Sequence, residues 1–141
     1  MMFRAILALS FVVAAVMPAP AAESPWPDIT GRWRAKSQVQ HTLPIRALDI
    51  ARCPGGLCGR AVNEDGSCGP TVLRLTENRT GTLHGTILVE GGISMPAYAS
   101  PQAEWLLVGA FRRSADPNRK LLPLVAEYVR EGPPRCGPAV P

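Results

Sequence analysis

The chain has 141 residues and a formal charge of +4, with 15 Lys and Arg against 11 Asp and Glu. This mild basic excess is far below that of a dedicated nucleic-acid-binding protein, so we expect no nucleic-acid partner. The length suits one domain with one core, and 4 cysteines are present that can staple a core of that size.

The first residues follow the order of a secretory signal peptide. Arg4 supplies a positive charge, the run from Ala5 to Met17 is apolar apart from Ser10, and small residues follow up to Ala22. The apolar run is shorter than the ~20 residues that a membrane-spanning helix needs. We therefore expect cleavage of residues 1–22, a bacterial periplasmic or secreted protein, and no transmembrane span after cleavage.

The mature chain begins and ends with Pro-rich segments, residues 23–30 and 132–141, which enclose a region of strand-like runs, residues 31–131. Within that region, Val72–Thr76 and Thr82–Glu90 alternate between apolar and polar side chains. This period of two indicates strands that are buried on one face.

The second half of the region is less regular. Ile93–Pro101 is interpreted as a loop or a short edge strand, because it contains Pro96. The runs 105–112 and 121–130 are apolar on both faces, and the turn residues between them favour a hairpin over a buried helix. About seven or eight short strands result. They predict an all-β fold, a small barrel or a sandwich. We favour a small antiparallel β-barrel, in which no strand edge stays exposed.

The positions of the four cysteines predict which disulfides cross-link this barrel. Cys53 and Cys58 flank a Pro-Gly-Gly turn between two strand-like runs, and Cys68 and Cys136 both open the pattern Cys-Gly-Pro-x-Val. We favour the disulfides Cys53–Cys58 and Cys68–Cys136, with the pairing Cys58–Cys68 and Cys53–Cys136 left open. Disulfides are favoured over a zinc site, because the spacings lack a paired Cys-x-x-Cys and exported thiols oxidise.

Two stretches resemble a known family. The run from Asp28 to Trp33 resembles the Gly-x-Trp opening of lipocalin-like barrels. The cysteine hairpin that follows resembles that of a family of uncharacterised bacterial secreted proteins with a lipocalin-like (calycin) barrel, so the resemblance covers about residues 28–62. It implies that Trp33 closes the base of the barrel and that an arginine near the last strand, Arg130 or else Arg135, packs over its ring. It implies no catalytic residue and is compatible with ligand binding.

The remaining polar residues predict little chemistry. The sequence has no Gly-x-Ser-x-Gly, phosphate loop or His-Glu-x-x-His, so we expect no enzyme, no cofactor and no metal site. His84 is interpreted as solvated, and a metal site of His41, His84 and a carboxylate is the open alternative. Asp49 is interpreted as an outward partner of Arg46 or Arg60; if it faced the interior it would orient a polar ligand.

These observations favour a non-enzymatic, lipocalin-like binding or envelope-associated protein. Its expected partners are a small apolar ligand, the envelope surface or another protein, and the basic residues around the hairpin tip 112–120 suit lipid head groups or an acidic partner. Trp105, Phe111 and Tyr128 are expected to line the core or a cavity in it. The alternative is a secreted protease inhibitor or interaction module, in which residues 23–28 enter a protease cleft.

Overall fold

The structure is a computed structural model that describes residues 17–19, 28–36, 43–76, 82–113, 117–118 and 121–137. Most of the expected signal peptide lies outside these residues, as do His41, the loop 77–81 and the end of the Pro-rich tail, residues 138–141.

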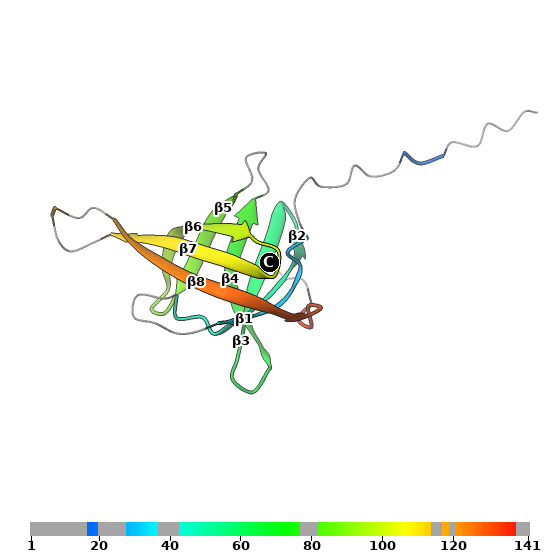
Figure 1. Cartoon of the computed structure of the whole chain (residues 1–141), viewed down its shortest axis with the longest axis horizontal. Helices are drawn as coiled ribbons and strands as arrows, with labels where there is room; N and C mark the ends of the chain where they lie inside the picture. Colours follow the sequence, from blue (N-terminus) through cyan, green and yellow to red (C-terminus); the bar gives the residue numbers. More distant parts are fainter. Residues whose placement is uncertain are drawn as a thin grey trace, which may run out of the picture.

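The described chain folds into a closed antiparallel barrel in which each strand pairs with the next and the last pairs with the first (Figure 1). Its strands are β1 Gly31–Ala35, β2 Ala47–Cys53, β3 Gly56–Val62, β4 Cys68–Thr76, β5 Leu83–Val89, β6 Ile93–Pro101, β7 Trp105–Arg113 and β8 Leu121–Gly132. The predicted all-β barrel is confirmed, with eight strands. No helix in the described ranges has the length and apolar character needed to cross a membrane.

Alternation along the strands produces the core. On β4, Leu73 and Leu75 are buried while Arg74 and Thr76 are exposed, which is the predicted pattern. The inward side chains of all eight strands join in one hydrophobic core, to which Ile29, Leu43 and Ile45 outside the strands also belong. Its larger members on the strands are Trp33, Leu48, Ile50, Leu57, Leu73, Leu75, Leu83, Ile87, Met95, Leu106, Val108 and Tyr128. The inside of the barrel is therefore a packed apolar core.

β6 corrects one expectation. It is a nine-residue strand paired on both sides, so the interpretation of Ile93–Pro101 as a loop or edge strand is wrong. Pro96 lies in the part of β6 that pairs with β5 alone, because the pairing with β7 begins only at Ala97. Proline, which has no backbone N–H to donate, is tolerated where one side of its strand has no partner.

Both favoured disulfides are present. Cys53–Cys58 spans the turn between β2 and β3, and Cys68–Cys136 joins the start of β4 to the segment that follows β8. The Cα atoms are 5.7 Å apart in each pair. The alternative pairing is excluded, and no described cysteine is free.

Candidate functional site

Trp33 and Arg130 meet at one end of the barrel, as the resemblance implied. The indole Nε1 of buried Trp33 donates to the carbonyl of Ile29 at 2.9 Å, and the guanidinium carbon of Arg130 lies 4.4 Å from the ring centroid. Arg130 also donates to the carbonyl of Asp28 at 2.6 Å and to that of Thr30. Arg130 therefore both covers the tryptophan and ties the segment before β1 to β8.

The contacts of the backbone explain why a glycine, Gly31, stands two residues before Trp33. Gly31 has a φ of 151°, and a Cβ at this position would lie 2.6 Å from Arg130 Nη1 and 2.9 Å from the carbonyl of Gly132. Just before it, the backbone N–H of Thr30 donates to Asp28 Oδ1 at 2.9 Å, and this hydrogen bond lowers the pKa of the Asp28 carboxyl. The Gly-x-Trp stretch is thus built for close approach of β8.

Replacing Arg130 by alanine is expected to lower the free energy of unfolding by about 1–2 kcal/mol, because it removes the ring contact and two charged donors. Lysine keeps the positive charge but lacks the two guanidinium nitrogens that donate to two carbonyls, so Arg130→Lys should recover only part of the lost unfolding free energy. Urea denaturation followed by circular dichroism measures both. Equal stability of the alanine variant and the original protein would contradict this role.

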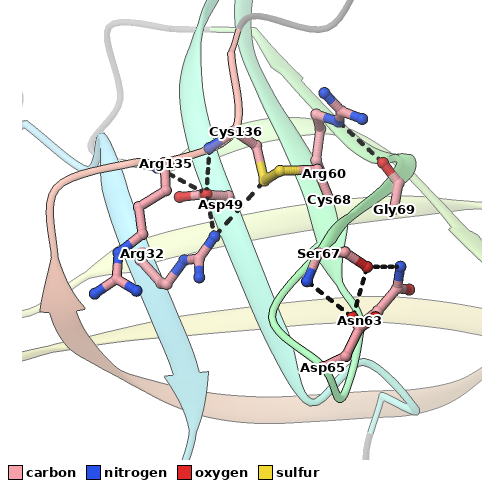
Figure 2. The surroundings of a disulfide bond; sticks show 10 residues. All are labelled: Arg32, Asp49, Arg60, Asn63, Asp65, Ser67, Cys68, Gly69, Arg135 and Cys136. Carbon is pink, nitrogen blue, oxygen red and sulfur yellow. Dashed lines mark hydrogen bonds and ion pairs between the residues drawn. A yellow bond between two sulfur atoms is a disulfide. The ribbon is translucent and has the colours of Figure 1, made fainter.

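Asp49 lies at the centre of a buried polar cluster on the outer side of β1 and β2 (Figure 2). Arg32 Nη2 donates to Asp49 Oδ2 at 2.8 Å, and the side chains of Arg32 and Asp49 are only 7% and 0% exposed. The segment after β8 covers the pair: the backbone N–H groups of Arg135 and Cys136 donate to the same oxygen at 2.9 and 2.7 Å. Asp49 thus binds the segment that contains Cys136 to the outer face of β2.

The cluster confirms the outward direction predicted for Asp49, corrects its partner and excludes the alternative that it faces the interior. Asp49 points away from the barrel interior, and its partner is Arg32 instead of Arg46 or Arg60. Arg46 instead forms an exposed ion pair with Glu64 at 3.0 Å, and Arg60 donates to the carbonyl of Gly69 at 2.9 Å. Arg135, the second candidate for the tryptophan contact, contributes its backbone to Asp49.

Two polar atoms in this cluster have no partner within the described protein, Arg32 Nε and Asp49 Oδ1. Arg32 Nη2 also lies 3.7 Å from the Cys136 sulfur, so the ion pair and the disulfide are in contact. At the other half of that disulfide, Asp65 accepts hydrogen bonds from the backbone and hydroxyl of Ser67, which order the turn before Cys68. Together these contacts join the segment that follows β8 to β2 and to the turn before Cys68, which is a structural role.

The three aromatic residues expected to line a cavity divide between the two faces. Tyr128 points inward and is fully buried; its hydroxyl donates to the carbonyl of Ile45 at 2.7 Å, and burial raises its pKa. Trp105 and Phe111 are not in the core, because they alternate with the buried Leu106, Val108 and Ala110, and Phe111 is 39% exposed. The expectation is therefore wrong for Trp105 and Phe111.

The outward aromatic and aliphatic side chains gather around Gly109 on β7. The strand register places Tyr98 of β6 and Val125 of β8 on either side of Gly109. A Cβ on Gly109 would lie 2.2 Å from the Tyr98 ring, so that ring lies across the glycine, 5.7 Å from the ring of Phe111. We call Tyr98, Leu107, Gly109, Phe111 and Val125 the outer patch. The sequence signal for it was the run that is apolar on both faces.

Two other features carry less chemistry. An open hollow of about 300 Å³ lies beside the Cys53–Cys58 hairpin, between that turn and residues 74–76 and 85–86. Its one charged side chain, Arg74, has Nη1 3.7 Å from the Cys58 sulfur. His84 is exposed on β5, and among the described residues no cluster of His, Cys, Asp or Glu has a metal-binding arrangement.

The described chain is thus an eight-stranded antiparallel barrel with two disulfides, a buried Arg32–Asp49 ion pair and an apolar outer patch. Comparison with family models, curated proteins and solved structures finds no match to the chain.

Proposed function

We propose that this protein is an exported, non-enzymatic binding protein with a lipocalin-like barrel, and that it associates with the cell envelope through the outer patch. The observation that carries the proposal is the contrast between the two faces of the barrel wall. The inward side chains pack into one core, whereas further apolar side chains lie on the outer face of the barrel around Gly109. Within the outer patch Phe111 is exposed, and Tyr98, Leu107 and Val125 are half-buried. Apolar side chains gathered on an outer face mark interaction sites on small soluble proteins.

Export is supported by two independent features. The N-terminal sequence has the order of charge, apolar run and small residues that a signal peptidase recognises. All four cysteines pair in disulfides, which persist in oxidising compartments and are rare in the cytosol. Both features favour a periplasmic or secreted location.

The outer patch is a better candidate for binding than the interior. A small apolar ligand inside the barrel would have to displace core side chains such as Leu48, Ile87 and Leu106, each 0% exposed. The protease-inhibitor alternative relies on residues 23–28, and only Asp28 of these is described. No described contact favours it.

Cell fractionation tests the proposal. Expressed in a Gram-negative host, the protein is expected to lose its signal peptide, begin near Glu23 and sediment with the envelope. Phe111→Ser should release about 90% of it to the soluble periplasmic fraction, because a buried phenylalanine contributes ~1.5–3 kcal/mol to association. The matched control is Val129→Ser, which removes a side chain of similar exposure, 37% against 39%, from the opposite end of the same outer wall.

A chain that keeps residues 1–22 and stays in the cytoplasm would overturn the export part of the proposal. Equal distribution of Phe111→Ser and Val129→Ser between the two fractions would overturn the part that concerns the outer patch. Thermal unfolding of both variants shows whether either change acts through loss of the fold.

A further inference from the structure

One end of the barrel is extended by a projecting hairpin. The pairing of β6 with β7 stops at Ala110, but β7 and β8 stay paired as far as Arg113 and Leu121. Figure 1 shows this hairpin running well beyond the other strands, at the left of the view. Phe111 and Arg112 therefore lie on a two-stranded extension that has no neighbouring strand on the β6 side.

Exposed apolar side chains concentrate at this same end. Because neighbouring strands are antiparallel, the end of β5, the start of β6 and the end of β7 lie together. Leu88, Ile93 and Phe111 occupy these positions and are 38%, 49% and 39% exposed. We call Leu88, Ile93, Phe111 and Arg112 the barrel tip. Large apolar side chains exposed together at one end of a barrel are costly in water, and they suit insertion into an apolar phase.

The charge of the hairpin sequence that contains Arg112 complements an anionic surface. Arg112 is exposed beside Phe111. In sequence, residues 111–122 contain four basic residues and one acidic residue, a net +3 in a chain whose total is +4. Glu90, in the turn after β5, is the nearby acidic residue among those described. Basic side chains next to apolar and aromatic ones are the combination that binds anionic bilayers, with the charges at the head groups and the apolar groups below them.

From these observations we infer that the barrel tip inserts into anionic phospholipid bilayers. This inference rests on the proposed envelope association and names its partner. A bilayer fits better than a folded protein, because the apolar side chains stand at two separate points, the β5–β6 turn and the projecting β7–β8 hairpin with its net basic charge. A fluid surface accommodates such separate points. The outer patch continues from Phe111 along β7 and adjoins the inserted tip.

Vesicle flotation tests the inference with the oxidised, exported protein. Vesicles of phosphatidylcholine and phosphatidylglycerol are expected to bind it, and vesicles of phosphatidylcholine alone to bind it at least about tenfold more weakly, because several basic residues each contribute ~1 kcal/mol near an anionic surface. Raising the salt concentration should weaken binding of the unaltered protein, since the Debye length falls to ~3 Å at 1 M. Equal binding to both kinds of vesicle would overturn the inference.

Matched variants assign the effect to the tip. Arg112→Gln should weaken binding about fivefold, the equivalent of one basic residue at the surface. Arg135→Gln removes the same charge from an exposed side chain after β8, at the opposite end of that strand from the hairpin, and should change nothing. Ile93→Ser should weaken binding through lost apolar contact, with circular dichroism unchanged. Equal effects of Arg112→Gln and Arg135→Gln would mean that only net charge matters, which contradicts a specific tip.

The two proposals fail in different ways. If Phe111→Ser releases the protein from the envelope in cells but the purified protein binds neither kind of vesicle, the lipid inference is wrong, and the outer patch binds an envelope protein. If the protein is never found with the envelope, the proposed function is wrong, whatever the vesicles bind.

Discussion

Replacing Asp49 by alanine is expected to lower the free energy of unfolding by about 3–5 kcal/mol, the loss typical of a broken buried ion pair. The change leaves the Arg32 guanidinium buried at 7% exposure without its carboxylate. It also removes the acceptor for the backbone N–H groups of Arg135 and Cys136. Guanidinium denaturation of the oxidised protein measures the loss.

Two further variants separate charge from hydrogen bonding. Asp49→Asn keeps an acceptor oxygen for the two backbone N–H groups but loses the charge opposite Arg32, so its stability should lie between those of the original protein and Asp49→Ala. Glu64→Ala breaks the Arg46–Glu64 pair, whose side chains are 65% and 82% exposed, and should cost less than about 1 kcal/mol. Equal losses for Asp49→Ala and Glu64→Ala would show that the buried cluster does not stabilise the fold.

The burial of Asp49 illustrates what the sequence does not contain. Alternation correctly separates Asp49 from its inward neighbours Leu48 and Ile50, but an outward side chain in a strand is normally solvated. What buries it is the segment around Cys136, 87 residues further along the chain. Strand periodicity describes the face on which a side chain lies, and it carries no information about a distant segment that covers that face.

The aromatic residues show a related limit. Trp105–Arg112 is apolar on both faces, so its period could not distinguish inward from outward positions. The structure places Val108 and Ala110 inward and Phe111 outward. Two local sequence signals predicted the disulfides more reliably than periodicity predicted the positions of the aromatic residues. The Pro-Gly-Gly turn predicted the Cys53–Cys58 hairpin, and the repeated Cys-Gly-Pro pattern predicted the long-range disulfide.

Removing the disulfide Cys68–Cys136 by a double change to alanine is expected to cost about 4 kcal/mol, because the bridge closes a long loop in the unfolded chain. The two cysteines are 68 residues apart in sequence. The matched control is the double alanine variant of Cys53–Cys58, whose separation of 5 residues predicts a loss of only about 2 kcal/mol on the same loop-entropy relation. Chemical denaturation of both variants gives the comparison, and a larger loss for the short loop would contradict this account.

The long-range disulfide and the Asp49 cluster should not act independently. Cys136 belongs to both, since its backbone N–H donates to Asp49 at 2.7 Å and its sulfur lies 3.7 Å from Arg32. Once Asp49 is gone, the covering segment has lost two hydrogen bonds; once the disulfide is gone, that segment can leave and let water reach Arg32. The triple variant is therefore expected to lose at least about 1 kcal/mol less than the sum of the two separate losses. Strict additivity would mean that the disulfide stabilises only through the unfolded chain and that the segment stays on Asp49 without it.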